Sequence, residues 1–238
     1  TILPNLTKVF ATSPYPTETF TSEPTIVIPT ETPGIGSTMT GKDGMTLLYV
    51  PAGEFTMGSD SGDSDEMPIH NVYLNAFWID QTEVTNKMYA LCVDAHICEE
   101  LTNASSYTRP SYYRNDTYDN YPVIYVDWEM AKTYCKWVDR KLPTEAQWEK
   151  AASWNGDNQT KRLYPWGDNA PDNTLVNYDN VKGDTTEVGK YPGGASYYGA
   201  LDMAGNVLEW IEDWYSRSYY GILASSSLPF PNPLGPEN

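Results

Sequence analysis

The chain has 238 residues, 40% of them hydrophobic, and its 15 basic and 32 acidic side chains give a net charge of −17. This length holds one full-sized domain with a tail. The negative charge repels phosphate backbones and anionic membrane surfaces, so it argues against nucleic acid and acidic lipid as partners. The excess carboxylates serve solubility, and some of them could collect divalent cations.

Residues 1–44 are rich in Thr, Ser, Pro and Glu and have little apolar surface to bury. We predict an extended arm or linker, whose ordinary role is a spacer that can carry O-linked glycans. The apolar pieces Ile2-Leu3 and Thr25–Ile28 leave a second interpretation open, in which the arm adds as a strand to a neighbouring subunit.

The chain begins at Thr1 without a basic-then-apolar leader and contains no run of about 18 apolar residues. We therefore expect no membrane span, no intact signal peptide and a start that is processed or trimmed.

The globular domain is expected over residues 45–238, because short apolar runs typical of strands begin at Thr46. The runs LLYV, EFTMG and NVYLNAFWID each predict a strand. The acidic loop 60–66 lies between the second and third runs and lacks the Gly and Glu register of an EF-hand. We interpret it as a solvated hairpin tip.

Three short helices follow, and each begins at a residue suited to cap it: Thr85, Asp127 and Thr144. The third has a capping-box pattern, with Gln147 three residues after Thr144. In the second, residues spaced as one helix face should be buried. That face consists of Ala131, Tyr134, Cys135 and Val138.

The later half of the chain contains few periodic patterns. Residues 154–205 are rich in Gly, Asn, Asp, Pro and Tyr, so we predict mostly loop, held by side-chain contacts to which metal contacts could add. Residues 206–215, NVLEWIEDWY, are expected to form a strand with aromatic anchors, and the chain then ends in turns and prolines.

Three cysteines are present. Cys92 and Cys98 lie six apart, a separation that a helix end and a turn could bridge as a disulfide. Cys135 is then the odd thiol, which could be a buried structural group, a reactive nucleophile or half of a bridge. Four N-x-[ST] sequons are glycosylation candidates if the chain is secreted. They begin at Asn5, Asn103, Asn115 and Asn158.

Six blocks of sequence occur in an order and spacing that resembles the formylglycine-generating-enzyme (sulfatase-modifying-factor) family. They are VPAGEFTMGS (50–59), PIHNVYLNAFWIDQTEVTN (68–86), PVIYVDWEMAKTYCKWV (122–138), RKLPTEAQWEKAA (140–152), YPWGD (164–168) and GALDMAGNVLEW (199–210). The resemblance covers about residues 45–234. It implies an α+β fold of the C-type-lectin-like kind, with little regular structure, long loops and bound calcium.

Enzymes of the family oxidise a substrate cysteine with molecular oxygen, using two copper(I)-binding cysteines in the last part of the domain. Here the sequence stops at NPLGPEN, so we expect the catalytic segment to be absent and copper not to bind. Cys135 matches a structural family position whose partner cysteine is missing. The related iron-dependent branch needs three histidines, whereas this sequence has only His70 and His96.

By the same resemblance, the block DMAGNVLE forms a calcium site. Asp202 and Glu209 would supply side-chain oxygens, and Gly205 and Val207 would supply backbone carbonyls, with Gly205 also permitting the tight turn. The alternative is a strand entry whose two carboxylates are merely solvated. A second calcium site would use Asn177, Tyr178 and residues near 180–182, although an Asx-rich turn explains that loop equally well.

Several tryptophans could form a sugar-stacking surface, as lectin-like folds suggest, although core packing accounts for most of them. They are Trp128, Trp137, Trp148, Trp166, Trp210 and Trp214.

Two functions follow from the sequence. The first is a non-catalytic extracellular or cell-surface module, stabilised by calcium, that binds itself, another extracellular protein or a glycan, with residues 1–44 linking it to a neighbour or a filament. The second is a fragment or split half of a formylglycine-generating-type oxidoreductase that a second chain completes.

Overall fold

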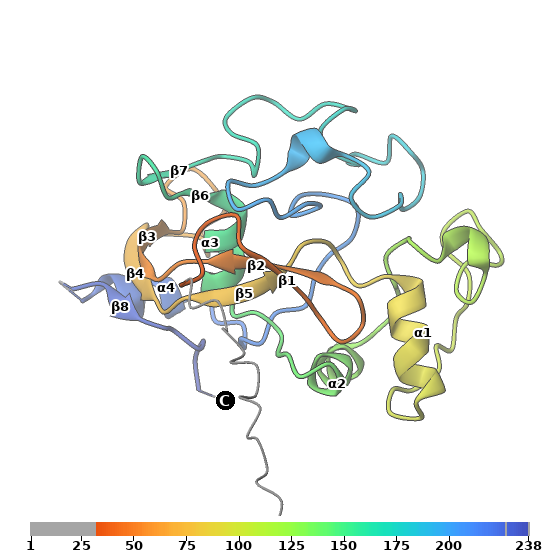
Figure 1. Cartoon of the computed structure of the whole chain (residues 1–238). Helices are drawn as coiled ribbons and strands as arrows, with labels where there is room; N and C mark the ends of the chain where they lie inside the picture. The colour runs from red at the N-terminus through yellow and green to blue at the C-terminus, as the bar shows by residue number, and fades with distance from the viewer. Residues whose placement is uncertain (1–31, 227, 238) are drawn as a thin grey trace, which may run out of the picture. The chain divides into compact units, whose positions relative to one another are not determined.

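The computed structural model describes residues 32–226 and 228–237 (Figure 1). Most of the predicted arm therefore lies outside the described residues. So do its two apolar pieces and the sequon at Asn5.

The apolar runs of the sequence form short strands. In chain order these are β1 (Thr38–Thr40), β2 (Thr46–Val50), β3 (Gly53–Met57), β4 (His70–Leu74), β5 (Phe77–Asp80), β6 (Trp154–Asn155), β7 (Thr160–Lys161) and β8 (Phe230–Pro231). One antiparallel sheet has the order β1-β2-β5, and a second has the order β3-β4-β8, in which β8 runs parallel to β4 (Figure 1). β6 and β7 form a separate hairpin.

The folded unit begins earlier than residue 45. Strand β1 falls within the predicted arm 1–44, yet it pairs with β2 through Thr38 opposite Leu48 and Thr40 opposite Thr46. All three β1 residues are exposed. The sequence gives no strand signal here because this edge strand is held by backbone hydrogen bonds and buries no apolar face.

The three predicted helices are confirmed, and their predicted caps are in place. They are α1 (Asn86–Asp94), α2 (Trp128–Trp137) and α3 (Glu145–Ser153). The structure also has a short helix, α4 (Tyr219–Ala224), and two single 3₁₀ turns, η1 (Asp116–Tyr118) and η2 (Pro192–Gly194). The side chains of Thr85, Asp127 and Thr144 each accept a hydrogen bond from the backbone of their helix, and Thr144 forms the full capping box.

The larger hydrophobic core joins both three-stranded sheets to α3 and to the loop near residue 200. Strand β4 alternates strictly, so that His70, Val72 and Leu74 point inward. The same core includes Val50, Phe55, Met57, Ala151, Trp154, Ala200 and Tyr220. Sequence segments far apart therefore meet at one centre, which fixes the loops that leave α3 and precede α4.

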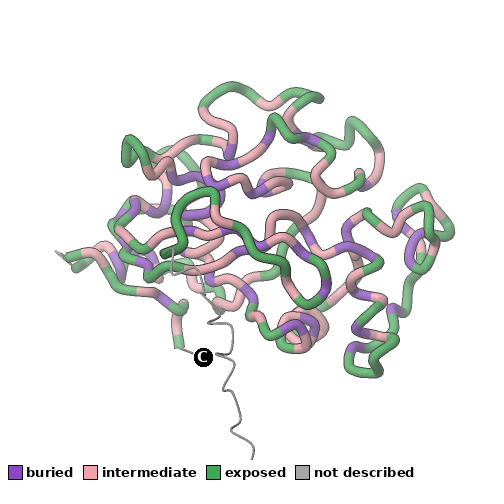
Figure 2. The backbone as a smooth tube through the Cα atoms, viewed as in Figure 1, coloured by how far each residue is buried: buried purple, intermediate pink, exposed green. Residues whose placement is uncertain are grey.

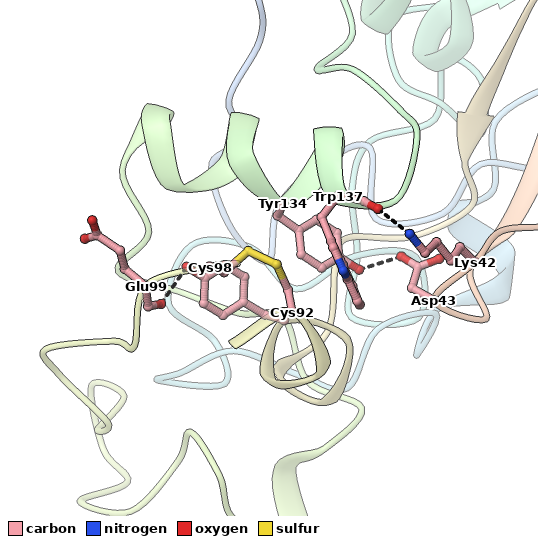
Figure 3. Close-up of a disulfide and its surroundings, with 8 residues drawn as sticks. Lys42, Asp43, Cys92, Cys98, Glu99, Tyr134 and Trp137 are labelled. Carbon is pink, nitrogen blue, oxygen red and sulfur yellow. Dashed lines mark hydrogen bonds between the residues drawn. A yellow bond between two sulfur atoms is a disulfide. The ribbon is translucent and has the colours of Figure 1, made fainter. Parts of the chain in front are cut away.

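A second core lies between α1 and α2 and contains the predicted disulfide (Figure 3). Cys92 and Cys98 are bonded, with their Cα atoms 5.3 Å apart. Beside them the Tyr134 hydroxyl donates a hydrogen bond to Asp43, so α2 is tied to the turn between β1 and β2. On the predicted α2 face, Tyr134 and Val138 are buried, whereas Ala131 and Cys135 are half-buried.

Loops carry much of the remaining chain, as predicted for residues 154–205, and Figure 2 shows buried positions along these loops as well as in the strands. The strand predicted over residues 206–215 is wrong, since this segment forms no ladder. Its backbone is fixed at separate points instead: Asn206 N–H donates to the Asn177 carbonyl and Glu212 N–H to that of Pro143. Within the described ranges, no helix has the length and apolarity to span a membrane.

Candidate functional site

The DMAGNVLE segment follows a tight path over the loop at residues 176–177. Asp202, Gly205 and Asn206 all have left-handed backbone, with φ of 58°, 77° and 54°. A Cβ added to Gly205 would lie 2.3 Å from the Asn177 carbonyl oxygen. Only glycine fits there, because the two backbones touch.

Asn206 is the anchor of this segment. Its amide oxygen accepts from Thr186 N–H at 2.8 Å and from Asn177 Nδ2 at 3.1 Å, and its Nδ2 donates to Glu83 Oε1 at 3.0 Å. These bonds fix the peptide groups on either side of Asn206. The carbonyl oxygens of Gly205 and Val207 accept no backbone or side-chain hydrogen bond from the described residues, so they remain able to bind another group.

Three carboxyl groups gather around the segment. Asp202 accepts from Gly189 N–H at 2.6 Å, and Glu209 accepts from the Trp148 indole N–H at 2.8 Å. Glu83 comes from the connection between β5 and α1, is 7% exposed, and has one oxygen, Oε2, that is buried without a donor. The segment therefore brings together oxygens from elements more than 100 residues apart.

Each of these groups resists ionisation. Burial, followed by the charges of Asp202 and Glu209, raises the pKa of Glu83 well above its usual range. Burial also raises the pKa of Asp202, although its contact with the Glu83 carboxyl opposes the rise. Glu209 is exposed as a residue, but burial of its carboxyl group raises its pKa to about 7. Solvent on the open side screens part of that effect.

Two other buried carboxylates have basic partners. Asp43 pairs with Arg140, and Asp184 lies 3.1 Å from Arg109. None of the ion pairs formed by the described residues includes Glu83, Asp202 or Glu209. Without a counterion such carboxyl groups favour the protonated form, and a bound cation would favour their ionised form.

The available donors suit a hard cation. Carboxylate and carbonyl oxygens, which calcium prefers, are present in Asp202, Glu209, Gly205 and Val207. Within residues 32–226 and 228–237, no three Asp, Glu, His or Cys side chains lie close enough together to hold a metal by themselves. A site here would therefore depend on the backbone carbonyls that Asn206 positions.

A family model, the sulfatase-modifying factor enzyme 1-like domain, matches residues 37–232. The chain belongs to this family. The formylglycine-generating enzyme of Streptomyces coelicolor is 30% identical over 239 residues, covering 79% of this chain and 74% of that enzyme. The family resemblance inferred from the six sequence blocks is thus confirmed.

Other relatives combine this domain with further sequence. The serine/threonine-protein kinase Pkn1 of Chlamydia trachomatis serovar L2 is 38% identical over 200 residues, which cover 80% of this chain and 31% of the kinase. The chain spans about a third of the length of such relatives. Among solved structures, PvdO of Pseudomonas aeruginosa has a TM-score of 0.62 at 23% identity over 85% of this chain and 84% of PvdO. The predicted mixed α+β fold of this family is therefore confirmed.

The second predicted calcium site stays a prediction. The Asn177 Nδ2 donates hydrogen bonds to the Asp184 carbonyl and to the Asn206 amide oxygen. Asn177 therefore supports the DMAGNVLE segment of this sulfatase-modifying-factor domain. The Tyr178 hydroxyl donates to the Pro171 carbonyl. Left-handed backbone at Asp179 and Asn180 is typical of the Asx-rich turn that was the alternative.

The free thiol and the two histidines form no hydrogen bond with this segment among the described residues. Cys135 is half-buried, and burial together with the charge of Asp80 raises its pKa to about 12. His70 is buried beside Pro68, whose carbonyl lies 2.9 Å from the His70 Nδ1, whereas His96 is exposed.

The tryptophans lie nearer the surface than predicted. Trp210 and Trp214 are exposed, and the other four of the six are half-buried. Trp148 packs on the larger core and Trp137 on the second, so core packing accounts for only part of the set. Each exposed indole has an aromatic or backbone contact: Trp210 donates to the Val126 carbonyl, and Trp214 lies over Trp128.

The acidic loop and two of the three described sequon asparagines are exposed. The acidic loop 60–66 is mostly exposed, as expected of a solvated tip. Asn103 and Asn158 are exposed, whereas Asn115 is half-buried and its Nδ2 bonds to Ser111. Glycosylation of these sequons stays a prediction.

Glu83 is the residue that sequence reasoning missed. It lies in the quoted block 68–86, two residues before a helix cap, where a glutamate is usually solvated. Its partner Asn206 is 123 positions away, so no local pattern marks the contact.

Proposed function

We propose that this chain is a non-catalytic, extracellular binding and assembly module whose loops are held by calcium at the DMAGNVLE segment. The observation that carries the proposal is a set of three carboxyl groups without a basic partner among the described residues, one of them the buried Glu83, beside two carbonyls with no hydrogen bond. Asp202, Glu209, Gly205 and Val207 would hold the ion. Calcium would supply the positive charge that these oxygens lack, and would fix the loops without taking part in a reaction.

The state of the cysteines supports a non-catalytic role for these residues. Cys92 and Cys98 are consumed in a disulfide, and the raised pKa of Cys135 keeps it a thiol near neutral pH. Thiol oxidation, and copper(I) binding through cysteine, both proceed from the thiolate, which the neutral, half-buried thiol of Cys135 does not offer. The sulfatase-modifying-factor scaffold would then serve recognition.

A location outside the reducing cytoplasm suits the disulfide, because such bonds persist in oxidising compartments. Self-association, or attachment to another extracellular protein, would use the predicted arm 1–44, and the exposed Trp210 and Trp214 could stack on a glycan. The net charge of −17 disfavours nucleic acid as a partner.

Two measurements test the proposal. Protein treated with a chelator and then titrated with calcium should bind it by calorimetry and unfold at a higher temperature, whereas Asp202→Asn should do neither. Light scattering should show oligomers of the full chain that dissociate when residues 1–32 are removed. Absence of calcium binding to the intact chain refutes the proposed calcium site. Unchanged association after truncation refutes assembly through the arm.

A second candidate is one half of a formylglycine-generating-type oxidoreductase. It is favoured by the match to the Streptomyces coelicolor enzyme over 74% of that enzyme's length. A second polypeptide bearing two copper-binding cysteines would complete the site. Mass spectrometry of native material should then identify that co-purifying polypeptide, and its absence from an intact native complex argues for the first proposal.

A further inference from the structure

We infer that Glu83 is a positioning residue of the cation site, one that holds Asn206 and contributes a third negative charge beside the ion. The inference rests on the calcium site proposed above. It assigns a role to a residue outside the DMAGNVLE segment, from a different part of the fold.

The first observation is the orphaned oxygen of Glu83. The residue is 7% exposed, and Oε2 is buried without a hydrogen-bond donor, while Oε1 accepts from Asn206. Buried polar atoms in proteins almost always have a partner, so this oxygen is free to accept a positive group. The carboxyl group of Glu83 contacts that of Asp202, which is a candidate ligand.

The second observation is what the other oxygen does. Asn206 Nδ2 donates to Glu83 at 3.0 Å and, more weakly, to the Thr186 carbonyl at 3.3 Å. Since Asn206 stands between Gly205 and Val207 in left-handed backbone, the bond to Glu83 fixes the direction of both carbonyls. Glu83 thereby acts on the ligands through Asn206.

The third observation is how Glu83 itself is fixed. Glu83 lies between β5 and α1. Two residues before it, the Gln81 N–H donates a hydrogen bond to the Thr46 carbonyl, and the Gln81 carbonyl accepts one from the Leu201 N–H. Residue 83 is thus joined to sheet β1-β2-β5 and also to the start of the DMAGNVLE segment. These bonds fix the backbone that leads into Glu83, and the bond from Asn206 orients its carboxyl group.

The charge count favours a divalent or trivalent ion. When an ion binds and displaces their protons, Glu83, Asp202 and Glu209 would supply up to three negative charges, and none of the ion pairs within the described ranges offsets them. Calcium affinity rises with the number of carboxylates at a site. Removing the charge of Glu83 should therefore weaken binding even if both ligand carboxylates remain.

The test is calcium affinity, measured by calorimetry on the full chain after chelator treatment. Glu83→Gln keeps an acceptor for Asn206 but removes the charge, and we expect its calcium Kd to rise at least about tenfold, the usual lower range for residues beside a metal ligand. Glu54→Gln is the matched control, because Glu54 is exposed on β3. We expect its Kd to stay at the wild-type value.

A spectroscopic readout separates ion binding from folding. Terbium alone can replace calcium, and the Trp148 indole, bonded to Glu209, is placed to sensitise its emission. The terbium midpoint should shift at least about tenfold in Glu83→Gln, with emission at saturation unchanged. Glu83→Asp keeps the charge but shortens the side chain that holds Asn206, so we expect its affinity to lie between those of Glu83→Gln and the wild type.

The outcomes are distinct. Wild-type affinity in Glu83→Gln overturns the inference while leaving the calcium site standing, and so does an equal loss in Glu83→Asp. Failure of the wild-type chain to bind either ion overturns the site and the inference together. If Glu83→Gln does not fold, Glu83→Asp decides alone: a loss of less than tenfold supports the inference, and a loss of tenfold or more overturns it.

Discussion

Lys150 should make this domain more stable at alkaline pH. Its side chain is buried in α3, 2% exposed, and its Nζ donates to the carbonyls of Pro51 and Gly53 at 3.0 and 2.9 Å. These neutral partners do not compensate for a buried charge, so burial lowers the pKa of Lys150 from 10.5 to about 8.

The magnitude follows from the two pKa values. At ~1.36 kcal/mol for each pKa unit, a fall from 10.5 to about 8 corresponds to ~3.4 kcal/mol of destabilisation while both the folded and unfolded chains are protonated. That penalty is complete below pH 8. It is relieved as pH rises, because the unfolded chain then binds the extra proton: ~1.4 kcal/mol is recovered by pH 9 and ~2.6 by pH 10.

The comparison with Lys150→Met isolates this effect. Methionine leaves the Pro51 and Gly53 carbonyls without a donor, which costs roughly 1 kcal/mol each at every pH. This cost offsets much of the stability that the variant gains at pH 7 by removing the buried charge. Every other titratable group is present in both proteins, so the pH dependence of the other groups cancels in the comparison. The free energy of unfolding in urea, measured from pH 7 to 10, should rise in wild type relative to the variant by the amounts above. A difference that stays flat with pH refutes the reasoning.

Three further predictions concern the site and its supports. Glu209→Gln should weaken calcium stabilisation: at a calcium concentration of 100 Kd the wild type gains ~2.7 kcal/mol, and a variant with tenfold weaker binding gains ~1.4, as calcium-dependent melting would show. Gly205→Ala should destabilise the fold by about 2–4 kcal/mol in chemical denaturation, because the new Cβ meets the Asn177 carbonyl in left-handed backbone. Asp184, whose pKa is lowered to about 2 by hydrogen bonds from Ser106 and Thr108 that outweigh its burial, should contribute ~2.4 kcal/mol above pH 4, lost as pH falls toward 2. Acid titration of Asp184→Asn should lack that loss.

Local sequence determined the elements whose signals are short-range. The caps at Thr85, Asp127 and Thr144 are set by side chains that bond a backbone N–H three residues ahead, so the sequence alone locates these helix starts. The Cys92–Cys98 disulfide joins residues six apart at a helix end, so the sequence alone also predicts it. The six ordered blocks fixed the family.

The tertiary structure decided everything that depends on distant backbone. Residues 206–215 have a strand-like composition but find no partner in register, and β1 is a strand without an apolar face. Glu83 shows the same limit, because its burial arises only when the β5–α1 connection meets Asn206. Periodicity reports how one segment meets a core, whereas the free energy of a buried charge depends on which groups the whole fold places around it.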